Sequence, residues 1–136
     1  MPGKREYVKG KHYELLLARK LRKMGFFVVR APASGRGKAR RPFPDLVAIR
    51  SGKVFFIEVK ERGDNRPIHV PKRLRDHFLS MAARAGAEFL LCVFYRSVGE
   101  FRCLELAACD YESKEYCVFR YRTFLEAGRR IEEVFG

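Results

Sequence analysis

The segment from Pro44 to Lys60 contains three side chains that could take part in catalysis or bind a metal ion: Asp45, Glu58 and Lys60 itself. Glu58 and Lys60 are two residues apart, so both point to the same face of a sheet if the segment is a strand. Two carboxylates on an apolar sheet repel each other and resist ionisation unless a cation lies between them. The residue types therefore favour a site for a divalent metal ion with a lysine beside it.

The same segment has the pattern of a β-hairpin. Two apolar runs flank a Ser-Gly pair at 51–52, a two-residue turn in which the glycine tolerates a positive φ. This turn pairs Arg50 with Lys53, and the same register sets Asp45 directly opposite Glu58, with Cβ atoms roughly 4.5–5.5 Å apart. The alternative is a solvated charge pair at the end of a strand. Both strands are apolar on both faces, which predicts a place in the middle of a sheet.

Carboxylates at this position suit the hydrolysis of a phosphodiester. That reaction requires an activated water, neutralisation of the phosphoryl oxygens and help for the leaving 3′-oxygen, and carboxylate-held divalent metals provide all three. Asp45 and Glu58 are the expected primary ligands, with the Val59 carbonyl oxygen as a further one. Lys60 is expected to orient or deprotonate the attacking water; the alternative is a salt bridge to Glu58 with no further role. The expected ion is Mg²⁺, one or two per subunit, with Mn²⁺ able to substitute.

An acid on the first predicted helix is a candidate for the same site. The helix is expected over 11–24, and Glu14 lies on its apolar stripe rather than on its polar face. One alternative is an acid at the edge of the stripe that reaches solvent. If the stripe packs over the sheet, Glu14 completes the metal shell. Arg30, at the end of a short strand over 26–30, then faces the scissile phosphate.

Charge is distributed unevenly along the chain. The net charge is +13 and the pI about 10.0. Residues 1–75 hold 21 Lys and Arg against 6 Asp and Glu, whereas residues 76–136 hold 8 against 10. The basic surplus thus belongs to the half that carries the carboxylates. Contact with nucleic-acid phosphates is the economical explanation.

A basic loop lies between the 26–30 strand and the hairpin. Residues 35–43 carry four cations and two glycines. This composition favours a mobile loop that binds phosphate; the alternative is a run of charged residues that is merely exposed to solvent. The residues expected to bind DNA are Lys9, Lys11, Arg30, Arg36, Lys38, Arg40, Arg41, Arg62 and Lys72.

The remaining patterns predict one α/β domain over residues 1–136, with helices flanking a central mixed sheet. Residues 1–9 are expected to be frayed. Beyond the hairpin, the predicted elements are a short strand at 68–70, a helix at 71–85, strands at 89–95, 101–106 and 116–121, and a helix at 123–135. The 101–106 strand alternates in polarity and is expected nearer to an edge.

Composition argues against several kinds of site and location. The four cysteines (Cys92, Cys103, Cys109 and Cys117) form no Cys-x-x-Cys pair and have no histidine near them, so no zinc site is expected. No apolar run approaches the ~20 residues of a membrane span, and the N-terminus lacks an apolar signal region. A soluble cytoplasmic protein is expected.

The order of the candidate residues resembles the PD-(D/E)xK nuclease superfamily. Its signature is matched by Pro-Asp at 44–45 and Glu-Val-Lys at 58–60, after a glutamate on the first helix. A longer match resembles the archaeal Holliday junction resolvases, in GFFVVRAPASG at 25–35, PDLVA at 44–48 and IEVK at 57–60.

This resemblance implies more than the composition does. It implies a homodimer with a restriction-endonuclease-like core that resolves four-way DNA junctions by paired Mg²⁺-dependent nicks, in recombination and repair. Junction shape is recognised more than sequence. The catalytic set that it implies is Glu14, Arg30, Ser34, Asp45, Glu58 and Lys60. Whether a sliding clamp or a helicase acts with the protein stays open.

One position departs from the family pattern. The basic residue common after the helix glutamate is Leu15 here, so a phosphate contact is lost or is replaced by Lys11 or His12. Two alternatives to a junction resolvase stay open: another PD-(D/E)xK DNA nuclease of restriction or repair type, and a non-catalytic DNA-binding module of the same fold. The intact Asp45, Glu58 and Lys60 argue against the second.

Overall fold

The computed structural model describes residues 4–31 and 42–136, with the side chains of 4–10 excepted. In chain order the elements are α1 Lys4–Lys23, β1 Phe27–Arg30, β2 Leu46–Arg50, β3 Lys53–Arg62, β4 Ile68–Pro71, α2 Lys72–Ala85, β5 Ala87–Tyr95, β6 Glu100–Glu105, β7 Tyr111–Glu112, β8 Tyr116–Phe119, α3 Tyr121–Glu126 and α4 Ile131–Phe135. The first helix begins at Lys4 rather than at Lys11, because extending a helix is far easier than nucleating one.

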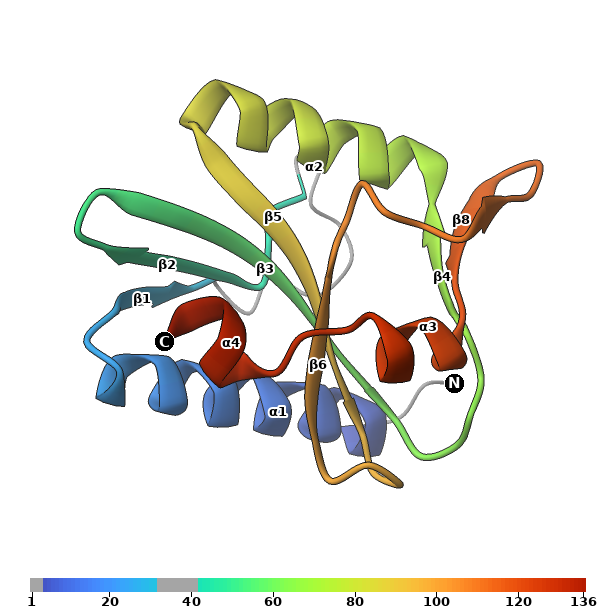
Figure 1. Ribbon diagram of the computed structural model, residues 1–136, viewed down its shortest axis with the longest axis horizontal. Coiled ribbons are helices and arrows are strands. Elements are labelled where there is room, and N and C mark those ends of the chain that lie inside the picture. Colours follow the sequence, from blue (N-terminus) through green and yellow to red (C-terminus); the bar gives the residue numbers. More distant parts are fainter. Residues whose placement is uncertain (1–3, 32–41) are drawn as a thin grey trace.

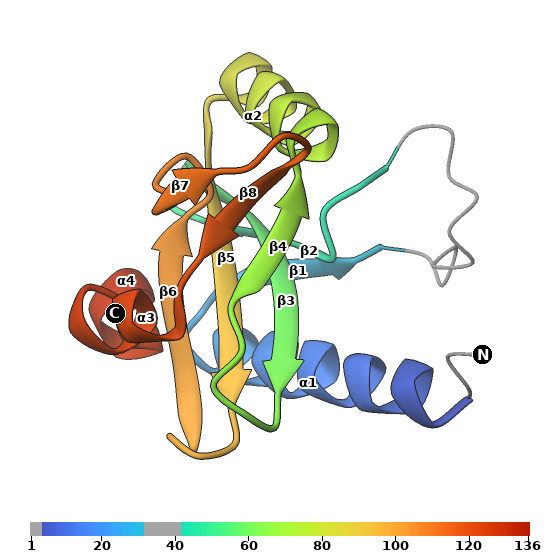
Figure 2. The same ribbon diagram turned by 90° about the vertical axis from the view of Figure 1, so that its right-hand side faces the viewer.

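The central layer is a five-stranded mixed sheet with the strand order β1-β2-β3-β5-β6. β3 and β5 are parallel, and the other neighbouring strands are antiparallel. β3 is therefore central and β6 is an edge strand, as the sequence predicted. α1 lies along one side of the sheet and α2 along the other (Figure 1, Figure 2).

The predicted hairpin joins β2 and β3. Ser51 and Gly52 have φ values of 51° and 78°, the positive values that a two-residue hairpin turn of this kind needs. Arg50 pairs with Lys53, and the ladder keeps this register to its far end at Leu46. The predicted register is confirmed, and it fixes which side chains meet just beyond that end.

The hairpin strands divide their side chains between two hydrophobic cores. The core shared with α1 and α4 takes Leu46, Ala48, Phe55, Ile57 and Val59, and the core shared with α2 and α3 takes Val47, Val54 and Phe56. Leu17 and Leu21 of α1 are fully buried in the first core. Burial of one leucine side chain is worth about 1.5–3 kcal/mol, so the apolar stripe holds α1 on the sheet.

Arg50 fixes the neighbouring chain ends. Its guanidinium donates hydrogen bonds to the carbonyl oxygens of Met24 at 2.7 Å and Phe135 at 2.8 Å. It also lies 4.3 Å from the centre of the Phe26 ring. These contacts tie the end of α1 and the end of α4 to β2, and hence to the hairpin.

A second, three-stranded sheet has the order β4-β8-β7. The strand predicted at 68–70 is present in it, whereas the strand predicted over 116–121 ends at Phe119, before α3 begins at Tyr121. The two-residue strand β7 was not predicted, since two residues carry no periodicity. This sheet lies to the right of the main one in Figure 1 and in front of it in Figure 2.

The single C-terminal helix predicted over 123–135 is wrong. The chain forms α3 and α4 with a break between them, where Arg129 exchanges two backbone hydrogen bonds with Cys103 at 2.8 and 2.9 Å. Gly128 disfavours a continuous helix at this point. The tertiary bonds to Cys103 outweigh the apolar helical pattern on either side.

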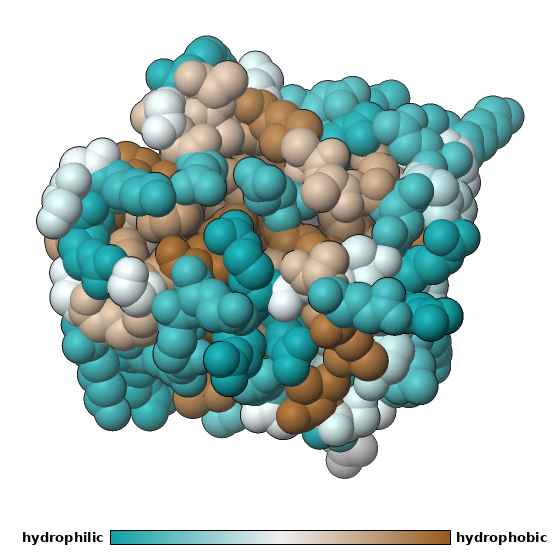
Figure 3. All heavy atoms as spheres, in the orientation of Figure 1, coloured by the Kyte–Doolittle hydropathy of each residue, from teal (hydrophilic) through white to brown (hydrophobic). Residues whose placement is uncertain are grey.

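Polar residues cover most of the face in Figure 3, and apolar residues show between them in patches, one of them alongside α2. In residues 4–31 and 42–136, no helix is both long enough and apolar enough to cross a membrane.

Candidate active site

Asp45 and Glu58 meet directly beyond the end of the β2–β3 ladder. The Asp45 backbone N–H donates to Oε1 of Glu58 at 3.2 Å, and the Val59 N–H donates to Oδ2 of Asp45 at 2.8 Å. The two acids thus face each other, as the register predicted. The alternative of a solvated charge pair is contradicted, because neither residue is exposed.

Burial makes both carboxyl groups hard to ionise. Desolvation, and then the nearby Asp45 charge, raise the pKa of Glu58 to about 8, and Lys60 opposes this shift. Desolvation also raises the pKa of Asp45, against the opposing effects of the Val59 N–H and Lys60. A cation at this position would offset the charge that burial disfavours.

Glu14 lies close to the same pair. Its side chain is half-buried, with Oε1 3.7 Å from Nη2 of Arg30. Desolvation and then Asp45 raise the pKa of Glu14 to about 7, while Arg30 and Lys60 oppose the shift. The alternative of an acid directed into solvent is therefore wrong. Packing of the α1 stripe on the sheet brings Glu14 to the hairpin.

The Arg30 guanidinium can donate further hydrogen bonds in this arrangement. Besides the contact to Glu14, its Nε is buried and has no hydrogen-bond partner among the described residues. Buried donors are normally paired, so an unpaired Nε is consistent with a missing acceptor such as a phosphate oxygen.

The donors present fit a hard divalent cation. Glu14, Asp45 and Glu58, called the carboxylate site below, offer oxygen ligands alone, which Mg²⁺ prefers. In the part of the chain that the structure describes, their oxygens do not all converge within 4.8 Å of one another. Glu14 lies on a different element, α1, and is paired with Arg30 rather than with the two hairpin acids.

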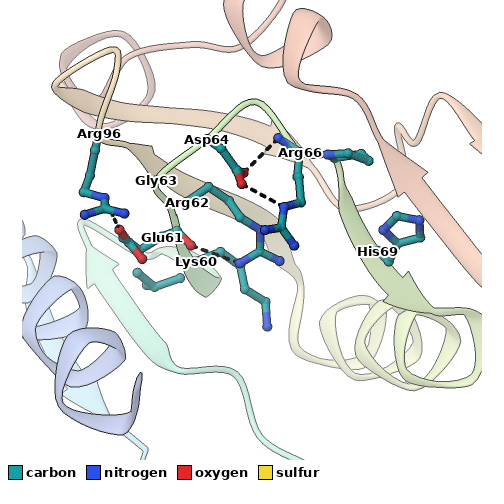
Figure 4. A pocket seen from close by; sticks show the side chains of 10 residues that line it. Lys60, Glu61, Arg62, Gly63, Asp64, Arg66, His69 and Arg96 are labelled. Carbon is teal, nitrogen blue, oxygen red and sulfur yellow. Dashed lines mark hydrogen bonds and ion pairs between the residues drawn. The ribbon is translucent and has the colours of Figure 1, made fainter. Parts of the chain in front are cut away.

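A pocket of about 890 Å³ adjoins the site through Lys60. Arg62, Arg66 and His69 line it, and Arg96 is paired with Glu61 at its margin at 2.8 Å (Figure 4). Sequence reasoning missed Arg66 and Arg96. Only the parallel pairing of β3 with β5 sets Arg96, the residue after β5, beside the basic end of β3: its N–H donates to the carbonyl oxygen of Arg62 at 3.0 Å.

The other residues expected to bind DNA fall into three groups. Arg62 lines the pocket and Lys11 is exposed on α1. Lys72 is ion-paired with Glu112 of the second sheet at 3.4 Å, and this pairing was not foreseen. The side chain of Lys9 and the residues Arg36, Lys38, Arg40 and Arg41 lie outside the described residues. The same holds for Ser34, which was expected to act in catalysis, and for most of the predicted 35–43 loop.

A central mixed sheet with two acids and a lysine at the end of its hairpin defines a restriction-endonuclease-like fold. The family model "Archaeal holliday junction resolvase (hjc)" matches residues 5–136. The chain belongs to the archaeal Holliday junction resolvase family.

Individual relatives agree with the family model. A crossover junction endodeoxyribonuclease Hjc of Sulfurisphaera tokodaii is 38% identical over 85 residues, 62% of this chain. A crossover junction endodeoxyribonuclease of Sulfolobus islandicus rod-shaped virus 1 is 30% identical over 116 residues, 82% of this chain and 92% of its own. The chain spans 58% of the Sulfurisphaera protein and 57% of the similar Sulfolobus acidocaldarius protein, less than two thirds of each.

The fold has a close counterpart among solved structures. Archaeoglobus fulgidus Hjc, a Holliday junction resolvase from an archaeal hyperthermophile, superposes with a TM-score of 0.80 over 93% of this chain and 100% of its own. The sequence identity of 24% makes this a likeness of fold alone.

Proposed function

We propose that this protein is a crossover junction endodeoxyribonuclease, which resolves four-way DNA junctions by paired nicks during recombination and repair in the cytoplasm. The observation that carries the proposal is the grouping of Glu14, Asp45, Glu58 and Arg30 around one end of the hairpin, with Lys60 beside them. The family match over residues 5–136 supplies the substrate class.

Family membership implies metal dependence, and the donor set supports Mg²⁺, with Mn²⁺ as a substitute. Asp45, Glu58 and Glu14 would hold one or two ions per subunit, together with the Val59 carbonyl oxygen. When bound, such an ion supplies charge neutralisation at the phosphoryl group, activation of water and stabilisation of the leaving 3′-oxygen.

The protein's own side chains contribute orientation and charge. Lys60 is adjacent to both acids, close enough to oppose their pKa shifts, so it can orient the attacking water and take part in its deprotonation. Arg30, with its unpaired buried Nε, can donate hydrogen bonds to phosphate oxygens in a bidentate contact. Its ion pair with Glu14 helps to hold the guanidinium in place until the phosphate arrives.

The cations around the neighbouring pocket extend this surface along the DNA backbone. Lys60, Arg62 and Arg66 face the same cavity, which suits the phosphates that flank the cut. Phosphate contacts of this kind carry no sequence information, which fits recognition of junction shape.

A homodimer is the assembly that paired nicks require, because two sites related by a two-fold axis match two symmetric cuts. An apolar strip on β1 supports it: one face of this edge strand packs on α1, and the other carries Phe27 and Val29, 67% and 46% exposed.

Phe27→Glu is expected to shift the protein from dimer to monomer in light scattering coupled to gel filtration. The matched control, Tyr111→Glu, changes an aromatic side chain that is 43% exposed on the second sheet and should stay dimeric. A dimeric Phe27→Glu protein would rule out this interface.

The activity is tested with a four-way junction and a linear duplex of the same sequence. With Mg²⁺, paired nicks in the junction and little cutting of the duplex are expected. Equal cutting of both would identify a general nuclease of the same superfamily. Binding without cutting in either Mg²⁺ or Mn²⁺ would identify a DNA-binding module.

A further inference from the structure

A group of three side chains that could hold a metal ion lies at the three-stranded sheet. Ligand atoms of Cys109, Glu112 and Cys117 all lie within 4.8 Å of one another. Cys117 is buried, Cys109 half-buried and Glu112 exposed, so the group opens to solvent on the side of the carboxylate. Among the described residues, it is the one such group of three.

The β7–β8 hairpin builds this arrangement. Glu112 and Cys117 are directly paired across the two antiparallel strands, so their side chains share one face. The Asp110 N–H donates to the carbonyl oxygen of Val118 at 2.9 Å, and Cys109, one residue earlier in the chain, has its sulfur within 4.8 Å of the Cys117 sulfur. The spacing Cys-x₂-Glu-x₄-Cys therefore becomes a cluster only when the hairpin forms.

Two cations from the start of α2 hold the carboxylate of the cluster. Arg75 Nη1 lies 2.9 Å from Oε2 of Glu112, and Lys72 Nζ lies 3.4 Å from its Oε1. They keep Glu112 ionised, with a pKa below its ordinary value. Arg75 is also paired with Asp76 at 2.8 Å.

The charges of the cluster and its neighbours sum to zero in two states: without metal and with both thiols protonated, and with a divalent ion and both thiols ionised. With both thiols protonated, Glu112 and Asp76 match Lys72 and Arg75. With both thiols ionised, a divalent cation restores the same balance. Binding therefore exchanges two thiol protons, released to solvent, for one M²⁺ ion held by two sulfurs and one oxygen.

We propose that Cys109, Glu112 and Cys117 form a cation site, called the thiolate site below, that binds a zinc-type ion. Two thiolates and a carboxylate are ligands that Zn²⁺ takes in tetrahedral sites, and the exposure of Glu112 leaves the fourth position to water. The ion links β7, β8 and the segment that follows β6, and it reaches α2 through Lys72 and Arg75. Its donors differ from those of the carboxylate site, so the proposal is independent of the nuclease function.

Cobalt substitution tests the proposal, because Co²⁺ bound to thiolate shows an intense near-ultraviolet charge-transfer band that carboxylate-bound Co²⁺ lacks. Metal-free protein, reduced with a phosphine and kept anaerobic, is titrated with Co²⁺ and then with Zn²⁺. The expected result is a thiolate band and tetrahedral visible bands that saturate at about one ion per chain and that Zn²⁺ removes.

Two variants and a control locate the ion. Cys109→Ser should abolish the charge-transfer band, and Glu112→Gln should weaken binding by roughly tenfold or more. Cys109 and Glu112 are not buried, so both variants should fold, which circular dichroism checks. The control Glu115→Gln removes an exposed acid from the turn of the same hairpin and should bind as the parent does.

Three outcomes would overturn the proposal. The first is no thiolate band, and the second is a band that Cys109→Ser leaves intact. The third is a Cys109–Cys117 disulfide that forms under an excess of oxidised glutathione despite saturating Zn²⁺, which would show that the two sulfurs bond to each other in preference to the ion.

Discussion

The carboxylate site and the thiolate site bring candidate metal ligands together in opposite electrostatic settings. In the first, burial raises the pKa values of Glu14, Asp45 and Glu58, and Lys60 and Arg30 offset only part of this. In the second, Glu112 is exposed, and Arg75 and Lys72 lower its pKa. The buried acids carry charge that their surroundings disfavour, whereas the exposed acid is already matched.

This difference suits different tasks. Buried carboxylates whose negative charge is not neutralised by nearby side chains suit an ion that must act on an incoming phosphate. A low-dielectric site strengthens each interaction of such an ion with developing charge. A satisfied carboxylate next to two sulfurs suits an ion that holds a hairpin in shape. The comparison therefore predicts that changes at the two sites have separate, and in one respect opposite, effects.

The largest expected effect is on cleavage. Asp45→Asn should reduce the rate of junction cutting by roughly a thousandfold or more, because a primary ligand is lost, while binding to the junction persists. The rate is measured in single-turnover assays and the binding by gel shift. Cys109→Ser should cut at the parent rate. Equal losses in the two variants would mean that the sites are not separate.

The second effect is on the stability of the metal-free protein. Glu58→Gln should stabilise it by roughly 1–3 kcal/mol near pH 8, because the neutral amide keeps the shape without the buried charge. Since the pKa of Glu58 rises from 4.5 to about 8 on folding, the parent loses stability as the pH rises through this interval, and the gain in the variant vanishes below it. Urea unfolding at several pH values with a chelator measures this difference.

The matched substitution at the exposed acid should lower the stability of the metal-free protein instead of raising it. Glu112→Gln removes an ionised group that Arg75 and Lys72 stabilise, so it should slightly destabilise the metal-free protein at neutral pH. Because the pKa of Glu112 is lowered on folding, this loss should disappear as the pH falls below the carboxyl range. A gain in stability for Glu112→Gln in the same unfolding series would contradict the comparison.

The smallest effect is expected at the pocket. Arg96→Ala should weaken binding of the junction only a few-fold and lower the salt dependence of binding by at most about one unit of slope, because it removes one of the cations that line the pocket. It also frees the Glu61 carboxylate. Arg122→Ala, an exposed arginine on α3 paired with Glu126, is the matched control and should bind the junction as the parent does.

The two sites also differ in how far the sequence predicts them. The carboxylate site follows from local rules: a Ser-Gly turn sets the hairpin register, and an acid on an apolar helical stripe reveals Glu14. The thiolate site depends on β7, which has two residues, and on its pairing with β8. Such a strand has no periodicity to read, and the absence of a Cys-x-x-Cys pair predicted no zinc site, so the sequence did not point to the proposed thiolate site.

The same limit accounts for the errors in the fold. β4 lies far from β8 in the sequence, and only their tertiary pairing makes the second sheet. The break between α3 and α4 depends on backbone bonds from Arg129 to Cys103 on β6. Local pattern predicts elements whose partners are near in the chain, while these features come from partners that are far away.

The most direct test of the account is a calorimetric titration of Mg²⁺ into metal-free protein with bound four-way junction, comparing the parent with Asp45→Asn. A junction with a methylene group in place of the bridging 3′-oxygen of each cut phosphate has no leaving group and would keep the substrate intact. We expect one or two ions per subunit in the parent and a loss of affinity of at least tenfold in the variant. Equal affinity for Mg²⁺ in both proteins would contradict the assignment of the catalytic cation to the carboxylate site.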